Sequence, residues 1–305
     1  MMLRALAAAL LIAGAAGAWE RQVDGLSGTW LAPDGARAAV VILPGSGPTD
    51  RDGNQPGLRT DALKRLAEAL AGHGIASLRA DKRGVGASAA AAPAEADLRL
   101  GTYVADAAAW ARAVADWHGA PPVLLGHSEG ALVATLAAGQ APVAGLVLLA
   151  GAGHPADVLI ARQLAEAGLP ADLAAASARI AAALKSGQPV ADVPAVLMPL
   201  YRPSVQPYMM SWLPLDPAAE LARLPAALPV LVVGGTTDLQ TGADEARVLA
   251  AARPGAELAL IGGMNHILRR APADRAANLA TYAQPDLPLA PGLAETLARF
   301  IAALP

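Results

Sequence analysis

Residues 126–130 read Gly-His-Ser-Glu-Gly and match the pattern G-x-S-x-G. They follow the apolar run 122–125 and precede a helical pattern that starts at Ala131. In this strand–turn–helix context, the serine lies on a sharp turn with its hydroxyl exposed at the edge of a sheet. The flanking glycines avoid Cβ clashes in the turn, and the helix directs backbone N–H groups at the serine. The pattern predicts that Ser128 is a nucleophile; a plain strand-to-helix turn is the alternative.

An acid and a histidine follow Ser128 in the chain order that this motif requires. Asp238 comes after the apolar run 230–233, and His266 comes after the run 258–261. A neutral imidazole can accept the proton of a serine hydroxyl, and a buried carboxylate fixes its tautomer and stabilises the imidazolium. We therefore predict Ser128 as nucleophile, His266 as general base and Asp238 as the acid that orients the base.

Two other residues compete for these roles. Glu245 is the alternative acid. Asp238 would then be a cap of the helix expected over residues 244–252, although Thr241 or Asp244 is better placed for capping. His154 also follows an expected strand and is the alternative base. It precedes Asp238 in the chain, however, which is contrary to the expected order.

The glycine-containing loop 44–54 follows the buried run 38–43. A phosphate-binding or dinucleotide-binding loop is excluded, because no Lys-Ser/Thr follows the glycines and the loop does not open a helix. Glycines at such a place let a backbone N–H approach a carbonyl oxygen of the substrate. We predict an oxyanion hole formed by the N–H groups of Ser46 and Glu129. Three charged residues are expected to hold the loop through salt bridges rather than to contact substrate: Asp50, Arg51 and Asp52.

Apolar runs typical of buried strands alternate with helical patterns along most of the chain. The expected strands are 26–32, 38–43, 75–79, 123–125, 143–149, 229–233 and 257–261. The expected helices are 61–73, 102–117, 129–138, 244–252 and 293–304. This alternation predicts an α/β fold, with a mostly parallel central sheet and helices on both faces. Parallel strands end at one edge, so the loops that carry Ser128, Asp238 and His266 should meet there.

The alternation stops over residues 153–225, which contain helical stretches and a proline-rich segment but no convincing strand. We expect this segment to be a helical cap inserted between two parts of one core, residues 19–152 and 226–305. Aromatic residues and methionines concentrate in the segment, although the chain has only five Trp, four Tyr and one Phe. Such side chains suit an adaptable apolar roof over an acyl site; ordinary packing is the alternative. The predicted roof residues are Tyr201, Tyr208, Met209 and Trp212.

Residues 1–18 have the pattern of a secretory signal peptide. Arg4 precedes the apolar run 5–13, and Ala16-Gly17-Ala18 fits an A-x-A cleavage site. We expect export to the periplasm or the medium, with Trp19 as the first residue of the mature chain. An uncleaved anchor is the alternative, but the run is short for a membrane span.

Composition narrows the possible functions. The chain has no cysteine, which excludes disulfides, thiol catalysis and cysteine-based zinc sites. A formal net charge of −3 and the lack of any long basic run argue against a nucleic-acid partner. No stretch beyond the N-terminus is long and apolar enough to predict a membrane span. We therefore expect no nucleic-acid partner and no membrane contact beyond the export signal.

Several stretches resemble motifs of the α/β-hydrolase superfamily. Residues 81–88 read Asp-Lys-Arg-Gly-Val-Gly-Ala-Ser and are similar to its D-x-R-G-x-G-x-S stretch. Four further segments also resemble motifs of this superfamily: the loop 44–54, the turn 126–130, Gly-Thr-Thr-Asp at 235–238 and Gly-Met-Asn-His at 263–266. The chain from residue 19 onward resembles bacterial carboxylesterases and serine-aminopeptidase-like hydrolases related to dienelactone hydrolase. The resemblance implies a serine hydrolase under a helical cap, with no cofactor and no metal. Many relatives have His-Gly where this chain has Pro44-Gly45.

Together these patterns predict hydrolysis of a small-molecule carboxylic ester through an acyl-enzyme on Ser128. A peptidase or a thioesterase that uses the same residues is an alternative, because one fold hosts many chemistries. A non-catalytic binding module on a hydrolase scaffold is another. The complete set of serine, acid and histidine in the required order argues against that last alternative.

Overall fold

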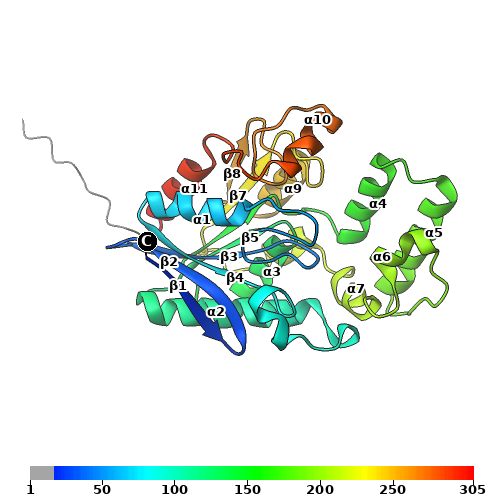
Figure 1. Ribbon diagram of the computed structural model, residues 1–305, viewed down its shortest axis with the longest axis horizontal. Helices are drawn as coiled ribbons and strands as arrows, with labels where there is room; N and C mark the ends of the chain where they lie inside the picture. Colours follow the sequence, from blue (N-terminus) through cyan, green and yellow to red (C-terminus); the bar gives the residue numbers. More distant parts are fainter. Residues whose placement is uncertain (1–16) are drawn as a thin grey trace, which may run out of the picture.

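The computed structural model describes residues 17–305 and shows a twisted central sheet between layers of helices (Figure 1). Eight strands form the sheet in the order β1-β2-β4-β3-β5-β6-β7-β8. The strands are β1 (Gly17–Val23), β2 (Leu26–Ala32), β3 (Ala38–Leu43), β4 (Ile75–Ala80), β5 (Val123–His127), β6 (Gly145–Leu149), β7 (Val230–Gly235) and β8 (Glu257–Ile261). Strand β2 pairs antiparallel with β1 and β4, and all other pairs are parallel. The predicted mostly parallel α/β architecture is confirmed.

Helices cover both faces of the sheet, which explains why its central strands are apolar throughout. In β3, Val40 and Ile42 belong to the cluster under α1 (Ala62–Gly72) and α11 (Leu293–Ala302). The alternate residue Val41 belongs to the opposite cluster, under α2 (Leu100–His118), α3 (Glu129–Ala138) and α9 (Ala243–Ala252). Because successive side chains of a strand point to opposite faces, a strand covered on both sides needs apolar residues at every position.

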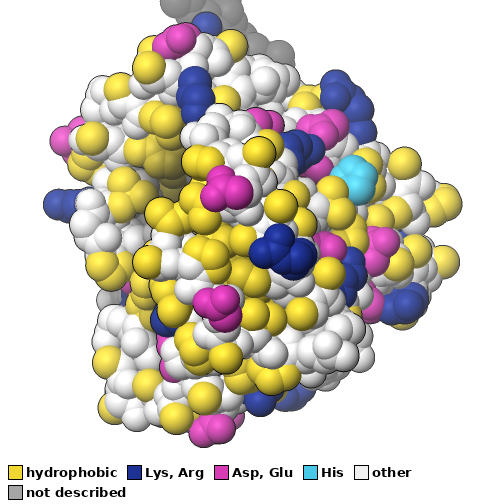
Figure 2. Space-filling model, turned by 90° about the vertical axis from the view of Figure 1, so that its right-hand side faces the viewer, with side chains coloured by type: hydrophobic (Ala, Val, Ile, Leu, Met, Phe, Trp, Pro, Cys, Tyr) yellow, Lys and Arg dark blue, Asp and Glu magenta, His cyan; other side chains and the backbone are white. Residues whose placement is uncertain are grey.

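The segment predicted as the cap contains five helices: α4 (Ala156–Glu166), α5 (Ala171–Lys185), α6 (Met198–Tyr201), α7 (Gln206–Trp212) and α8 (Pro217–Ala222). In Figure 1, helices α4 to α7 stand together beside the sheet on the right, whereas α8 packs against α3 and α9 of the core. Figure 2 looks onto this side of the molecule and shows many hydrophobic side chains between scattered charges. Exposed large hydrophobic residues of this segment include Val158, Val196 and Met198.

Two elements were not expected from the sequence. Strand β1 is polar and mostly exposed, and it pairs only with β2, so its sequence lacks the apolar pattern of a buried strand. Helix α10 (Arg275–Ala280) is short, and Asp274 caps it by accepting the N–H of Ala277. Four short 3₁₀ helices complete the structure: η1 (Gly86–Ala91), η2 (Glu95–Asp97), η3 (Ala195–Leu197) and η4 (Thr281–Ala283).

Most of the predicted signal peptide, residues 1–16, lies outside the described residues; Gly17 and Ala18 begin β1. Among residues 17–305, no helix has the length and apolar character needed to cross a bilayer.

Charged residues hold the loop that follows β3. The Arg51 guanidinium lies 2.7 Å from Asp81 and also reaches Glu20, while the backbone N–H of Arg51 donates to Asp81 at 2.8 Å. Asp52 pairs with Arg79 of β4. These contacts join the loop to β1 and β4, as predicted for Arg51 and Asp52, and they leave residues 44–47 to approach the neighbouring turn. Asp50 instead accepts backbone N–H groups inside the loop, from Asp52 and Asn54.

Replacing Trp110 of α2 by alanine tests the core beneath this edge of the sheet. Trp110 is 2% exposed and packs edge-on against Trp117, with 6.2 Å between ring centroids. Truncating a buried ring leaves a cavity and lowers the free energy of unfolding by about 3–5 kcal/mol. Urea unfolding should show this loss for Trp110→Ala and a much smaller one for Trp19→Ala, whose side chain is 50% exposed. Equal losses would contradict this arrangement of the core.

Candidate active site

Ser128 lies in a sharp turn between β5 and α3. Its backbone has φ 58° and ψ −123°, a strained conformation that few residues other than glycine adopt. A Cβ on Gly126 would lie 2.0 Å from the carbonyl oxygen of Gly130, and a Cβ on Gly130 would lie 2.5 Å from that of Leu43. The two glycines therefore make the turn possible, and the turn presents the Ser128 hydroxyl at the carboxyl edge of the sheet.

The structure brings the three predicted residues together at this edge. His266 Nε2 lies 3.1 Å from Ser128 Oγ, and His266 Nδ1 lies 2.9 Å from Asp238 Oδ2. Asp238 follows β7 and His266 follows β8, so parallel strands deliver both side chains to the turn after β5. The arrangement can move a proton from the serine hydroxyl to the imidazole while a carboxylate holds the far nitrogen.

The carboxylate of Asp238 is 8% exposed and well supplied with donors. It accepts the N–H groups of Gln240 at 2.8 Å and Thr241 at 3.0 Å, besides the imidazole of His266. Burial by itself raises the pKa of Asp238, but His266 and the two N–H groups outweigh burial and hold that pKa below its ordinary value. Asp238 is therefore ionised where it faces His266.

Thr241 completes the surroundings of this pair. Its hydroxyl donates to Asp238 at 3.0 Å, lies 3.3 Å from His266 Nδ1 and reaches the carbonyl oxygen of Ala150 at 2.8 Å. The sequence suggested Thr241 as a helix cap, but Gly242 occupies the N-cap of α9 and Thr241 braces the acid instead.

Glu245 and His154, the alternative acid and base, bond to each other at 3.0 Å. Glu245 also accepts the N–H groups of Gly153 and His154 and pairs with Arg162 of α4 at 3.0 Å. These bonds tie the start of α4 to α9, so both residues connect the cap segment to the core rather than serve Ser128.

The two predicted oxyanion donors flank Ser128. A Cβ on Gly45 would lie 3.1 Å from that of Ser128, so only glycine lets the loop come this close. Ser46, Ser128 and Glu129 line one cavity. Within residues 17–305, neither the Ser46 N–H nor the Glu129 N–H donates to another group. Both donors are thus available to an oxygen atom bound beside Ser128.

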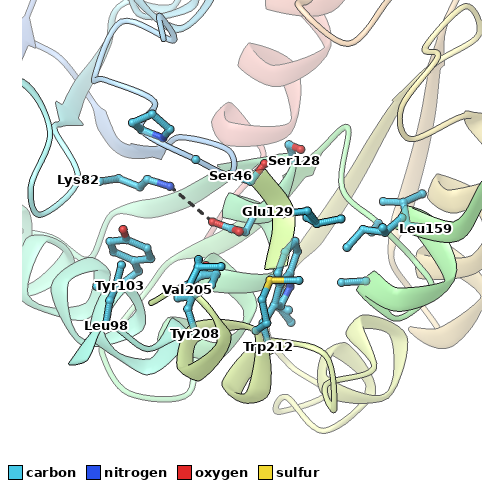
Figure 3. Close-up of a pocket in the computed structure, with 18 of the residues that line it drawn as sticks. Ser46, Lys82, Leu98, Tyr103, Ser128, Glu129, Leu159, Val205, Tyr208 and Trp212 are labelled. Atoms are coloured by element: carbon cyan, nitrogen blue, oxygen red, sulfur yellow. Dashed lines mark ion pairs between the residues drawn. The ribbon is translucent and has the colours of Figure 1, made fainter. Parts of the chain in front are cut away.

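This cavity has a volume of about 650 Å³ and lies between the core and the cap segment (Figure 3). Among the predicted roof residues, Tyr208, Met209 and Trp212 line it. All three belong to α7, where Tyr208 and Met209 precede Trp212 by four and three residues, spacings that put them on one side of the helix. Other apolar lining residues include Leu98, Leu132, Leu159, Ile160 and Val205.

The prediction that Tyr201 roofs the cavity is wrong. Tyr201 ends the separate helix α6, is fully buried, and its hydroxyl bonds to Ser177 of α5 at 2.9 Å. Its carbonyl oxygen accepts the side chain of Gln206 at 2.9 Å. Tyr201 therefore packs inside the cap segment, because the break between α6 and α7 turns it away from the face that α7 presents.

Lys82 and Tyr103 line the cavity and were not predicted. The Lys82 side chain is 8% exposed, and its ammonium lies 3.5 Å from the Glu129 carboxylate and 4.7 Å from the ring centroid of Tyr103. Its sequence offered a signal: Lys82 is one of only three lysines, and it follows a buried strand as the predicted site residues do.

No group of three or more His, Asp or Glu side chains in the described part of the chain is arranged to hold a metal ion.

Residues 57–286 match the profile of the serine aminopeptidase family S33. The chain belongs to this family. The match spans most of the chain and confirms the resemblance to α/β-hydrolases. No curated protein sequence matches the chain.

Solved structures share the fold at low sequence identity. Proline iminopeptidase of Mycobacterium smegmatis is 16% identical, with 94% of this chain and 98% of that one covered and a TM-score of 0.57. Est1E of Butyrivibrio proteoclasticus, solved with ferulic acid, is 17% identical, with coverages of 93% and 99% and a TM-score of 0.56. An esterase domain from Rhodothermus marinus is 17% identical, with coverages of 88% and 95% and a TM-score of 0.50. S33 family membership makes the chain a serine hydrolase of the α/β class, and the solved structures share its fold.

His127, the last residue of β5, supports the loop that carries His266. Its Nε2 lies 2.8 Å from the carbonyl oxygen of His266, and the two ring centroids are 4.9 Å apart. Burial, with a smaller effect of the neighbouring His266, lowers the pKa of His127 from 6.5 to about 4. The neutral ring can thus donate its Nε2 proton to that carbonyl throughout the neutral pH range.

The low pKa of His127 predicts an acid-dependent loss of stability. Below about pH 6.5 the unfolded chain binds a proton at this imidazole, whereas the folded chain does not until about pH 4. Between these values the free energy of unfolding falls as the pH falls, by at most roughly 1.4 kcal/mol per pH unit from this residue. Glutamine has an amide donor but does not titrate, so His127→Gln should lack this contribution.

Urea unfolding of both proteins between about pH 7.5 and pH 5 measures the effect. The difference in free energy of unfolding should shift in favour of His127→Gln as the pH is lowered. A constant difference across this range would show that folding does not depress the pKa of His127.

Proposed function

We propose that this serine hydrolase cleaves carboxylic esters of small molecules through an acyl-enzyme on Ser128. The hydrogen-bonded series Ser128–His266–Asp238, with separations of 3.1 and 2.9 Å, is the observation that carries the proposal. A nucleophile, a base within reach of its proton and a group that orients the base are the parts that acyl transfer requires.

In the proposed reaction, Ser128 Oγ attacks the ester carbonyl carbon and its proton passes to His266 Nε2. The oxygen that becomes negative lies between the N–H groups of Ser46 and Glu129, and Asp238 stabilises the imidazolium. The intermediate collapses when His266 returns the proton to the departing alcohol. Water then attacks the acyl-enzyme in the same way, with His266 as base, and releases the acid and free Ser128.

The charges around the cavity favour an ester over a peptide with a free amino terminus. Two carboxylates line the cavity within the described residues, and both are paired: Glu129 with Lys82, and Glu95 with Arg202. A substrate ammonium would have to displace Lys82 from Glu129, which is costly because that pair is buried. At Glu95 it would compete with Arg202 in an exposed pair, where binding of a cation gains little. Neutral acyl and alcohol groups fit the apolar lining without such a cost.

A peptidase is the second candidate, because the chain belongs to the serine aminopeptidase family and shares its fold with a proline iminopeptidase. Comparing p-nitrophenyl esters with aminoacyl arylamides and acyl-CoA thioesters distinguishes the classes. We expect the highest kcat/KM on esters of neutral acids. A preference for aminoacyl arylamides would replace the ester proposal with a peptidase.

Replacing Ser128 by alanine tests the nucleophile. Loss of the nucleophile from such a set lowers the rate by about 10⁶-fold. The change removes only one half-buried hydroxyl from the turn, so the fold should be little affected. Ser128→Ala should lose ester hydrolysis and labelling by a fluorophosphonate while the melting temperature stays close to that of the wild type. A folded variant with more than a few per cent of wild-type turnover would exclude Ser128 as nucleophile.

Trp212→Ala tests whether α7 touches the acyl group. Removing an apolar group from a substrate pocket changes discrimination between substrates by about 1–3 kcal/mol, so the preferred acyl chain length should shift. The measurement is kcat/KM on a series of p-nitrophenyl esters, with Tyr201→Phe as the control, since Tyr201 lies in the same segment but away from the cavity. A lower melting temperature with an unchanged preference would make Trp212 a packing residue only.

A further inference from the structure

The contacts of Lys82 distinguish it from every other charged group at the cavity. It follows β4 at the carboxyl edge of the sheet, and its ammonium points into the interior (Figure 3). Lys82 Nζ donates to the carbonyl oxygen of Gly45 at 2.8 Å and lies 3.5 Å from the Glu129 carboxylate. Gly45 immediately precedes one predicted oxyanion donor, Ser46, and Glu129 carries the other.

The bond to Gly45 fixes the direction of the Ser46 N–H. The Gly45 carbonyl and the Ser46 N–H belong to one planar trans peptide group, in which they point in opposite directions. A cation that holds the carbonyl oxygen on one side therefore directs the N–H to the other side. It also polarises the peptide group, which makes the N–H a stronger donor, because hydrogen bonds in a series reinforce one another.

The ion pair with Glu129 holds the second donor residue. The Glu129 side chain is 4% exposed and starts α3, directly after the nucleophile. Its N–H has no partner within residues 17–305, while its carboxylate faces Lys82. A single ammonium thus contacts the peptide group of one donor and the side chain of the other.

We propose that Lys82 is a positioning residue of the oxyanion hole, which orients the Ser46 N–H through the Gly45 carbonyl and fixes Glu129 through the ion pair. The inference rests on the proposed function, since it concerns the same acyl transfer at Ser128. Lys82 itself does not touch the reacting atoms. Its effect reaches the transition state only through the two backbone donors, which bind the oxygen more strongly as its charge develops.

Stability alone does not explain a lysine at this place. Burial lowers the pKa of Lys82, with the Glu129 carboxylate opposing this effect, so the ammonium is costly to bury. Apolar side chains of similar size that replace a buried ion pair often stabilise a protein. The Lys82–Glu129 ion pair is costly to bury, yet it contacts the peptide group before Ser46 and the side chain of Glu129. Positioning of these two backbone donors explains the pair better than stability does.

Lys82→Met removes the ammonium and keeps the length of the side chain. Deleting one oxyanion donor lowers kcat by about 10²–10³-fold, so misdirecting one should cost roughly 10- to 100-fold. We expect this loss in kcat on p-nitrophenyl esters, with KM changed little. Fluorophosphonate labelling of Ser128 should slow to a similar degree, since Ser128 displaces fluoride while the phosphoryl oxygen occupies the same hole. Lys64→Met, on α1 and away from the cavity, is the matched control and should match the wild type.

Lys82→Met also leaves the buried Glu129 carboxylate without its cation, and that could disturb the fold. The double variant Lys82→Met/Glu129→Gln removes both charges, and Glu129→Gln alone keeps the bond from Lys82 to Gly45. The double variant should recover the melting temperature of the wild type. Its kcat should still lie roughly 10- to 100-fold below that of Glu129→Gln, as expected for loss of one directed donor. Equal kcat values for these two variants would overturn the proposal and leave Lys82 as a partner for Glu129 only.

Two further results have distinct meanings. A raised KM with unchanged kcat in Lys82→Met would overturn positioning and make Lys82 a substrate-binding residue. A wild-type protein in which fluorophosphonate does not label Ser128 would remove the proposed function, and the role of Lys82 with it. Equal labelling rates for wild type and Lys82→Met would refute the inference about Lys82 and leave the proposed function standing.

Discussion

The strained turn at Ser128 is the constraint on which the site depends. A residue with a side chain held at φ 58° persists only where its surroundings allow no other conformation. The carbonyl oxygens of Gly130 and Leu43 come so near Gly126 and Gly130 that no Cβ fits, and β6 accepts the Ser128 N–H at 3.0 Å. The end of β3, the end of β5 and the start of α3 are thereby packed into one another. This packing brings the Gly45 loop against Ser128 and places both proposed oxyanion donors at the same cavity.

At this edge the polar groups are buried, and their partners come from many parts of the chain. Thr241 and two backbone N–H groups hold Asp238, His127 holds the backbone of His266, and Lys82 holds the loop after β3. A buried polar group without a hydrogen-bond partner is costly in free energy. Each of these hydrogen bonds therefore also holds the buried group in one orientation. The carboxyl edge of a parallel sheet suits this arrangement, since each strand contributes one loop and the sheet fixes the spacing between them.

The sequence predicted what depends on local pattern. The strands β2, β3 and β8 and the helix α3 were predicted with their observed bounds, because their apolar residues and the glycine turn mark them directly. The approach of Ser128, Asp238 and His266 followed from chain order and the shared edge. Strand β1 could not be predicted, because an exposed edge strand needs no apolar pattern.

The misassigned Tyr201 and the overlooked Lys82 share one cause. In both, the direction of the side chain depends on tertiary structure. The direction of Tyr201 depends on the break between α6 and α7, and that of Lys82 depends on how the loop after β3 folds back.

Family membership and charge distribution bear on different parts of the function. Membership in the S33 family gives the class of chemistry, whereas a shared fold alone is compatible with many chemistries. The substrate depends instead on the side chains that face Ser128 across the cavity, and family membership does not determine these.

Recognition of an amino terminus needs a carboxylate that is free to pair with it. Here Lys82 already occupies Glu129 and Arg202 occupies Glu95, while α7 presents Tyr208, Met209 and Trp212. If Lys82 positions the oxyanion hole, Glu129 cannot also bind a substrate ammonium without weakening that hole. The same ion pair would then support catalysis and disfavour a cationic substrate, which links the proposed ester preference to the geometry of the turn.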